Sequence, residues 1–312
     1  ARAEVDPRAP LAVGSAVALV ALSLVHPAGS QAPADLDVVP VAVGLDWFYL
    51  AGYPLLDVIP GGQLWLIVAG GGLLLALLPW IPPVRQAPAA VVSLDNCNGC
   101  ARCFEDCPYS AITMEPRSDG KAYDLEAVVN DDNCMSCGIC VGACPTATPF
   151  RRATAIVPGI ELPEYPVADL RETTIAESSQ FVRGRRVLVY ACEHCGSQSL
   201  ADDSTRVITM PCVAMLPPAF IDFALSRNLA DGIAVAGCAD GDCFYRLGGE
   251  WMRQRVAGDR DPRLRGRVDH RRLRLLYSRA SERQLRTTSI AEFAADLRKL
   301  PKNRGSGRSR DA

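Results

Sequence analysis

Lysine and arginine are absent from a long stretch near the start of this 312-residue chain: none occurs between Arg8 and Arg85, although the whole chain has 33 of them. The sequence also lacks a glycine-rich dinucleotide loop, the spacing of a catalytic triad, and any basic stretch interleaved with aromatic residues. These absences argue against a self-contained enzyme and against a protein that binds RNA or DNA.

Two apolar runs occupy the stretch without basic residues, at about 9–26 and 63–82. A helix needs roughly 20 apolar residues to cross a hydrocarbon layer of ~30 Å. The second run has this length, and Trp65 and Trp80 near its ends are typical of membrane interfaces. We therefore expect two transmembrane helices. For the first run, the apolar core of a signal peptide is an open alternative.

Basic residues flank this pair of runs. Arg2 and Arg8 precede the first run and Arg85 follows the second, whereas the segment 27–62 between them carries Asp but no Lys or Arg. Basic residues favour the cytoplasmic side of a membrane. The pattern therefore predicts a protein of a prokaryotic cytoplasmic membrane, in contact with membrane lipid, with both termini and all of its metal sites on the cytoplasmic side.

All thirteen cysteines fall between Cys97 and Cys243. Secreted disulfide scaffolds are usually short, with cysteines scattered through loops, whereas the tight C-x-x-C spacings of this chain suit metal ligation in a reduced, cytoplasmic setting. Eight of the cysteines form two copies of one motif, C-x-x-C-x-x-C-x-x-x-C-P. The copies are Cys97, Cys100, Cys103 and Cys107, then Cys134, Cys137, Cys140 and Cys144.

This motif is typical of ferredoxins with two clusters. Its three closely spaced thiolates hold one cubane cluster, and its fourth cysteine ligates the other cluster. Zinc ligands, by contrast, usually come as two C-x-x-C pairs. The spacing therefore predicts two [4Fe–4S] clusters, the first on Cys97, Cys100, Cys103 and Cys144, and the second on Cys134, Cys137, Cys140 and Cys107.

From Arg186 onward, β-like segments alternate with helix-like ones, which predicts a parallel α/β sheet. The expected strands are 187–190, 206–210, 232–236 and 273–277, and the expected helices lie near 217–227, 246–257 and 290–299. Each of the first three strands brings cysteine to its carboxyl end, where open parallel sheets build their sites.

The cysteines of this region are Cys192, Cys195, Cys212, Cys238 and Cys243. A [2Fe–2S] cluster or a zinc site needs four ligands, so one of the five is spare, and both metals stay open from spacing alone. We interpret His194, inside the C-x-x-C pair, as a loop residue rather than a ligand.

Three segments carry a resemblance: Cys192-Glu193-His194-Cys195-Gly196, then Met210-Pro211-Cys212, then Gly237-Cys238-Ala239-Asp240-Gly241-Asp242-Cys243-Phe244-Tyr245-Arg246. Together they make about residues 184–300 similar to the delta subunit of methyl-viologen-reducing hydrogenase. The resemblance implies a [2Fe–2S] cluster and electron transfer to a flavin-containing heterodisulfide reductase subunit. That family often has two adjacent cysteines in the first segment, whereas Ala191 precedes Cys192 in this chain.

A second resemblance rests on Leu45-Asp46-Trp47-Phe48, Leu50 to Tyr53 and Leu78-Pro79-Trp80, which are similar to the C-terminal part of cytochrome b. In that family the carboxylate of a Pro-Glu-Trp-Tyr motif helps to take protons from quinol. The resemblance implies a quinone at an interface, with Asp46 as proton acceptor, although the Pro and Tyr of the motif are missing. The alternative is that Asp46 is a solvated loop acid. Neither run holds a pair of histidines, so the haem would belong to a separate cytochrome b subunit.

Basic residues are dense in two later stretches. They are Arg260, Arg263, Arg265, Arg267, Arg271, Arg272 and Arg274, then Arg298, Lys299, Lys302, Arg304, Arg308 and Arg310. They form either ordinary solvated surface or a docking surface for an acidic partner or anionic lipid.

These patterns predict a multi-domain chain with a transmembrane anchor at 1–85, an α+β ferredoxin-like module at 86–150, a linker at 151–183, a parallel α/β domain at 184–300 and a disordered basic tail at 301–312. The expected function is a membrane-anchored electron-transfer subunit that links a quinone/cytochrome b unit to a soluble flavin, hydrogenase or heterodisulfide-reductase-like partner. The alternative is a membrane-anchored redox sensor or docking protein whose last domain binds structural zinc.

Overall fold

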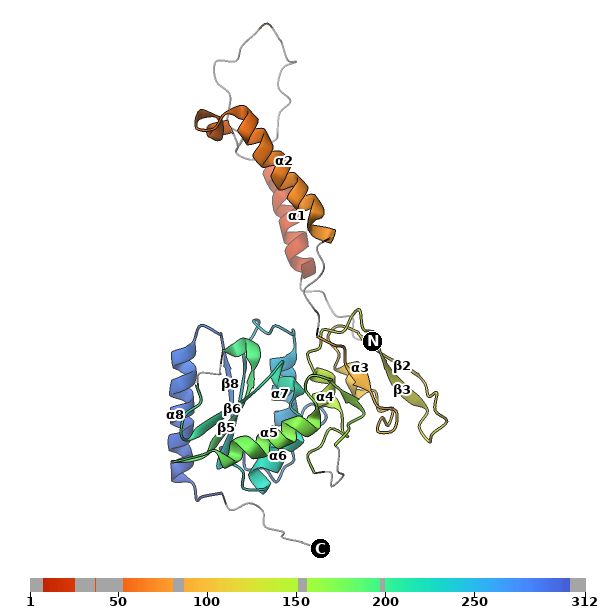
Figure 1. Cartoon of the computed structure of the whole chain (residues 1–312), viewed down its shortest axis with the longest axis vertical. Helices are drawn as coiled ribbons and strands as arrows, with labels where there is room; N and C mark the ends of the chain where they lie inside the picture. The colour runs from red at the N-terminus through yellow and green to blue at the C-terminus, as the bar shows by residue number, and fades with distance from the viewer. Residues whose placement is uncertain are drawn as a thin grey trace. The chain divides into compact units, whose positions relative to one another are not determined.

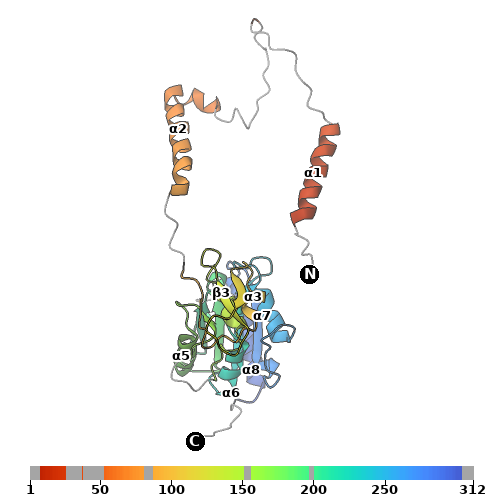
Figure 2. The same cartoon turned by 90° about the vertical axis from the view of Figure 1, so that its right-hand side faces the viewer.

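The computed structural model of the chain describes residues 8–25, 37, 53–80, 87–150, 156–196 and 200–303. These residues belong to two compact units, Ala1–Pro82 and Pro83–Ala312, which Figures 1 and 2 draw from two directions. Each unit is described by itself below.

The first unit is helical where it is described. It contains α1 (Arg8–Val25), the 3-10 turn η1 (Tyr53–Asp57), α2 (Gly61–Leu77) and the 3-10 turn η2 (Leu78–Trp80). Both apolar runs thus form helices, but the second helix stops at Leu77, five residues before the predicted end. Proline at position 79 has no backbone N–H with which to continue the helix, and the chain tightens into η2 instead.

The prediction of two transmembrane helices is wrong. Among the described residues, no helix is both long and apolar enough to cross a membrane. At 1.5 Å per residue, the 18 residues of α1 rise about 27 Å and the 17 residues of α2 about 26 Å, less than the ~30 Å of a hydrocarbon layer. The predicted location in a cytoplasmic membrane depended on these two helices and is wrong for the same reason. Asp46, the expected quinol-site acid, lies outside the described residues.

The first part of the second unit is built from short elements around the cysteine runs. They are β1 (Val91–Val92), α3 (Arg102–Glu105), β2 (Ile112–Pro116), β3 (Leu125–Val129), α4 (Ile139–Ala143) and β4 (Ile160–Glu161). Strands β2 and β3 pair antiparallel, as do β1 and β4. Strands β2 and β3 thus occupy the segment between the two motif copies, and β4 returns the chain to the segment that precedes the first copy.

A four-stranded sheet forms the second part of this unit, in the order β6-β5-β7-β8, with all strands parallel. The strands are β5 (Val187–Cys192), β6 (Thr205–Met210), β7 (Gly232–Cys238) and β8 (Leu273–Ser278). The helices are α5 (Val167–Ser179), α6 (Pro218–Ser226), α7 (Gly248–Ala257) and α8 (Arg283–Lys299). The remaining elements are the 3-10 turns η3 (Glu193–Cys195), η5 (Val213–Met215) and η6 (His270–Arg272). The predicted parallel α/β sheet is therefore confirmed.

Helices cover both faces of this sheet. Helix α8 packs on β7 and β8 on one face, and α5, α6 and α7 lie on the other (Figure 1). Every residue of the two central strands, β5 and β7, is buried. This explains why both strands are continuous apolar runs without alternation, as expected for a parallel sheet covered on both sides.

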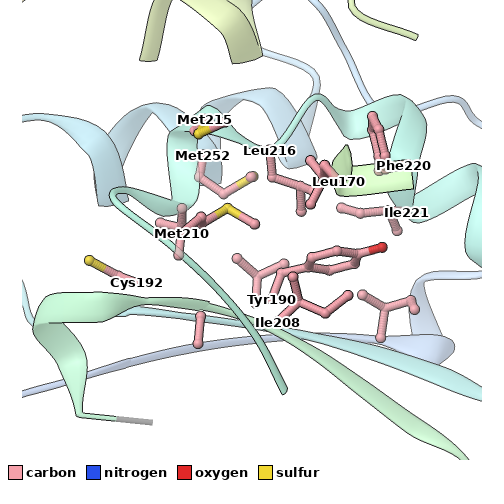
Figure 3. Packing of buried hydrophobic residues seen from close by; sticks show 14 of the residues in the cluster. Leu170, Tyr190, Cys192, Ile208, Met210, Met215, Leu216, Phe220, Ile221 and Met252 are labelled. Carbon is pink, nitrogen blue, oxygen red and sulfur yellow. The ribbon is translucent and has the colours of Figure 1, made fainter. Parts of the chain in front are cut away.

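The core between β5, α5 and α6 is shown in Figure 3, where Leu170, Tyr190 and Ile221 meet. The buried hydroxyls of Tyr190 and Thr174 are 3.0 Å apart, which satisfies both polar groups inside the core. Helix α5 lies inside the segment 151–183 that was predicted as a linker. Only three of its residues are buried, so its sequence has too few apolar repeats to indicate a helix. The domain boundaries inside the second unit stay predictions.

Candidate metal centres

The first group of cysteines faces one small cavity. Cys97, Cys100, Cys103 and Cys144 all line it, and the Cys103 thiol is close enough to the other three to interact with them electrostatically. Three of these cysteines come from the first motif copy and the fourth comes from the second copy. The structure therefore brings together the set that the spacing predicted for the first cluster.

The second group has the complementary arrangement. Cys107, Cys134, Cys137 and Cys140 line a separate cavity, and the Cys140 thiol interacts electrostatically with the other three. The backbone N–H of Ala111 donates to the Cys107 Sγ at 3.3 Å. Exchange of the fourth cysteine between the copies is thus present in the fold, while the role of these residues as ligands stays a prediction.

The backbone of each run is wound in the same way. Gly99 and Ala101 in the first run, and Ser136 and Gly138 in the second, have positive φ angles of 50° to 73° and occupy equivalent positions of the motif. Alternation of left-handed and right-handed residues turns successive N–H groups toward one side and makes a concavity for an anionic group. The two non-glycine residues pay a conformational cost of order 1 kcal/mol each. These turns are what fold C-x-x-C-x-x-C around a cavity.

Three of the thiols in these cavities, those of Cys103, Cys137 and Cys140, are poor acids without a cation. Burial, the largest effect, raises the pKa of Cys103 to about 12 and that of Cys137 to about 12, and it raises the pKa of Cys140 well above the ordinary value. Thiols buried in this way release their protons together only when a metal compensates the negative charge. The donor set and the apolar cavities therefore fit an iron–sulfur cluster.

The third group lies at the carboxyl end of the parallel sheet. Cys192 ends β5, Cys212 follows β6, and Cys238 ends β7, with Cys243 in the loop before α7. Their sulfurs form two pairs: the Cys192 and Cys238 Sγ atoms are 3.7 Å apart, and the Cys212 and Cys243 thiols are joined by a hydrogen bond. Across the described residues, however, no three metal-ligating side chains gather around a single ion position.

Within each pair, one thiol favours the thiolate. The hydrogen bond from Cys212, with backbone N–H groups of Gly248 and Gly249 at the start of α7, lowers the pKa of Cys243 to about 5 despite burial. The hydrogen bond between Cys238 and Cys192 likewise lowers the pKa of Cys238 to about 7. The N-terminal end of a helix stabilises negative charge, so α7 provides a favourable place for a thiolate ligand.

The fifth cysteine of this region is placed differently. Cys195 is fully buried, and its Sγ donates to two backbone carbonyls, at 2.9 Å to Cys192 O and 3.3 Å to Ala236 O. Next to it, the ring of His194 stacks on Phe244 at 3.9 Å. The Cys192 Sγ also donates to a backbone carbonyl, Pro211 O at 3.2 Å, so the feature specific to Cys195 is its contact with two carbonyls rather than one.

A buried patch connects the second and third groups. It contains Cys137 from one group and Cys212 from the other, with Ile139, Tyr245 and Trp251 packed among them. Because apolar side chains fill this space, the two cysteine groups share a wall from which water is excluded.

Sequence reasoning missed a side chain that supports the first group. The guanidinium of Arg117 is almost fully buried and donates to Cys97 O at 2.7 Å and to Leu94 O at 2.5 Å. It also forms an ion pair with Asp119 and lowers the pKa of that carboxyl to about 2. Its position after β2 gave no signal of this long-range contact.

The first arginine-rich stretch is largely engaged within the fold. Arg265 and Arg267 form ion pairs with the buried carboxylate of Asp222, and Arg274 forms one with Asp296. The side chains of these three arginines are 43–51% exposed, so they belong to the solvated surface and also form ion pairs with carboxylates of the α/β part. Residues 304–312 of the tail lie outside the described residues.

Comparison with known proteins agrees with two cysteine-bearing parts in the second unit, one around the motif copies and one around the parallel sheet. Residues 187–301 match the family described as methyl-viologen-reducing hydrogenase, delta subunit, and residues 96–148 match the 4Fe-4S dicluster domain. Neither match includes the segment 1–85, so the resemblance to cytochrome b gains no support.

Three proteins of known role are similar to parts of the chain. One, from the ferredoxin/F420H2-dependent CoB–CoM heterodisulfide reductase of Methanosarcina acetivorans, is 34% identical over 221 residues, which cover 68% of this chain and 25% of that protein. Another, from the ferredoxin:CoB–CoM heterodisulfide reductase of Methanosarcina mazei, is 32% identical over 113 residues, 36% of this chain and 14% of that protein. The third, the iron-sulfur subunit of the F420-non-reducing hydrogenase of Archaeoglobus profundus, is 33% identical over 97 residues, 31% of this chain and 70% of that protein. The chain thus spans a quarter or less of the two reductase subunits.

Proposed function

We propose that this chain, which belongs to the family of the methyl-viologen-reducing hydrogenase delta subunit, carries electrons along three iron–sulfur sites in series. That it is an iron–sulfur electron-transfer subunit with a [4Fe–4S] dicluster module follows from its family and its relatives. The proposal adds a [2Fe–2S] cluster in the α/β part and an order of sites, with the second ferredoxin site in the middle.

The observation that carries this proposal is the shared wall between the second and third cysteine groups. Cys137 and Cys212 belong to one buried patch, so no solvent separates the two groups there. Iron–sulfur clusters, when bound, supply reversible one-electron storage at potentials that their surroundings set. The side chains of this chain hold the sites in place, exclude water and bring the groups close together.

The pairing of sulfurs supports [2Fe–2S] over zinc at the third group. Each iron of a [2Fe–2S] cluster takes two thiolates, which matches Cys192 with Cys238 and Cys212 with Cys243. A structural zinc would draw four ligands around one point. We assign these four cysteines as ligands because their sulfurs lie in two pairs, and Cys195, whose Sγ contacts Cys192 O and Ala236 O, as the spare thiol.

The partner we propose is a soluble protein that is a flavin, hydrogenase or heterodisulfide-reductase-like subunit. The names of the relatives support this, since two are subunits of heterodisulfide reductases and one is a hydrogenase iron-sulfur subunit. In the Methanosarcina acetivorans protein the similarity covers 68% of this chain, so sequence like both the dicluster and the delta-like parts occurs within one reductase subunit.

Metal analysis of the anaerobically purified chain tests the third site. We expect roughly ten iron and ten acid-labile sulfide per chain, from two [4Fe–4S] clusters and one [2Fe–2S] cluster. Cys212→Ser is expected to lower the iron to about eight and to remove the [2Fe–2S] signal in electron paramagnetic resonance (EPR) spectra. Cys195→Ser is the matched control, since its hydroxyl can donate to the same carbonyls, and it is expected to keep all three sites. About eight iron and one zinc in the wild type would contradict the proposal.

A further inference from the structure

One buried arginine joins three segments of the second unit that are far apart in sequence. Arg255 of α7 is among the largest fully buried side chains. Its guanidinium donates to Asp106 Oδ2 at 2.5 Å, to Ala214 O at 2.6 Å and to Ile139 O at 3.3 Å. A buried guanidinium is costly unless its donors are satisfied and its charge is paired, and Asp106 provides the pairing.

Each of these three acceptors lies beside predicted cluster ligands. Asp106 stands between Cys103 and Cys107 in the loop that joins the two ferredoxin sites. Ile139 stands between two ligands of the second site, and Ala214 follows Cys212 of the third site by two residues. A single planar, rigid fork of donors therefore sets the spacing of the chain segments around all three sites.

Close packing around Arg255 leaves little freedom to these segments. A Cβ atom added to Gly142 of α4 would be 1.9 Å from Ala214 O and 2.6 Å from Arg255 Nη1. The backbones of helix α4 and the turn η5 are therefore in contact at this position, and the Arg255 guanidinium lies beside this contact. The second and third sites are held at a fixed separation.

The charges around Arg255 do not cancel. Asp106 accepts hydrogen bonds from both Arg255 and Arg260, so one carboxylate faces two guanidinium groups. Burial lowers the pKa of Arg255, yet a guanidinium stays protonated in proteins. The Cys212 thiol is near enough to interact with Arg255 electrostatically. The group thus places net positive charge next to thiolate-rich sites, where it favours the reduced form.

We propose that Arg255, held by Asp106, is a positioning residue that locks the third cysteine site against the second [4Fe–4S] site and raises the reduction potential of both. This inference rests on the proposed function, because it needs iron–sulfur clusters at the two sites. Arg255 acts through the loops that carry the ligands and through its charge.

Redox titration of the full chain, followed by EPR, tests this role with substitutions of opposite charge effect. Arg255→Gln removes a positive charge and is expected to lower the potentials of the second and third sites, with about a tenfold change in the equilibrium for accepting one electron, or about 59 mV. Asp106→Asn removes a negative charge and is expected to raise them. Arg255→Lys keeps the charge, so its potentials are expected to stay close to those of the wild type. Arg271→Gln, at an exposed ion pair with Asp269, is the control and should leave every potential unchanged.

The outcomes separate this inference from the proposed function. Iron content is measured in each variant, and potentials are compared only where it equals that of the wild type. Shifts of the same sign for Arg255→Gln and Asp106→Asn, or no shift in either, would overturn the electrostatic role. If Arg255→Gln loses iron, Asp106→Asn is compared with Arg255→Lys instead. Only a charge effect changes the reduction potentials in Asp106→Asn and leaves them unchanged in Arg255→Lys. Absence of a third cluster in the wild type would refute the proposed function, while the second [4Fe–4S] site would still report on Arg255.

Discussion

Substitution of Gly248 by alanine tests the geometry of the third site. Gly248 is the first residue of α7, and a Cβ atom at this position would be 2.1 Å from Cys212 Sγ and 3.6 Å from Cys243 Sγ. The helix therefore begins directly against a pair of proposed ligands. The φ angle of Gly248 is not positive, so backbone conformation does not require glycine at this position. The lack of space beside Cys212 Sγ requires it.

The size of the effect follows from these distances. Non-bonded heavy atoms prefer a separation of about 3.5–4.0 Å, so Cys212 Sγ and the new methyl group must move apart by roughly 1.5 Å. Metal–ligand distances tolerate only about 0.2 Å. Alanine favours the helix by about 1 kcal/mol over glycine, which is too little to offset the loss of a ligand. Gly248→Ala should therefore empty the third site, whereas the two ferredoxin sites, which lie in separate cavities, should keep their iron.

Iron and sulfide analysis, with visible circular dichroism and EPR, measures this outcome. We expect about eight iron per chain in Gly248→Ala against about ten in the wild type, with unchanged [4Fe–4S] signals. Gly266→Ala is the matched control, because no atom lies within 4 Å of the Cβ it would gain. A Gly248→Ala chain with full iron content and an unaltered third signal would refute the assignment of Cys212 as a ligand seated against α7.

The grouping of the cysteines was predictable because their ligand chemistry is encoded in local spacing. Two runs of the same motif specify both the cavities and the exchange of Cys107 and Cys144 between them. The parallel sheet was predictable for a similar reason, since strands and helices alternate and each of three strands ends at cysteine. The contact of the Cys195 thiol with Cys192 O and Ala236 O was not predictable, because it depends on packing.

Other features depend on contacts that sequence patterns do not contain. Apolar composition suggested spanning helices, but the length of α2 is limited by the proline after it. The pairing of Arg255 with Asp106 joins residues 149 positions apart, and nothing local marks either as buried. The left-handed turns at Ala101 and Ser136 are equally invisible, since neither residue type favours that conformation.

Two further predictions concern how the sites are held. Gly142→Ala should reduce the free energy of unfolding by about 1–3 kcal/mol and so lower the thermal midpoint, because the added methyl group would meet Ala214 O at 1.9 Å. Scanning calorimetry at one heating rate checks this. An unchanged or higher midpoint would show that α4 and η5 can separate without cost. Arg117→Gln should release iron from the first site to a chelator at least tenfold faster, since hydrogen bonds from charged donors contribute about 1.5–3 kcal/mol each and Arg117 holds the carbonyl of Cys97, itself a predicted ligand of that site. The second site, whose cysteines line a different cavity, should release iron at the wild-type rate, and Lys121→Gln, at an exposed ion pair, should behave as the wild type. Equal acceleration at both sites would mean that Arg117 supports the whole module rather than the loop around Cys97.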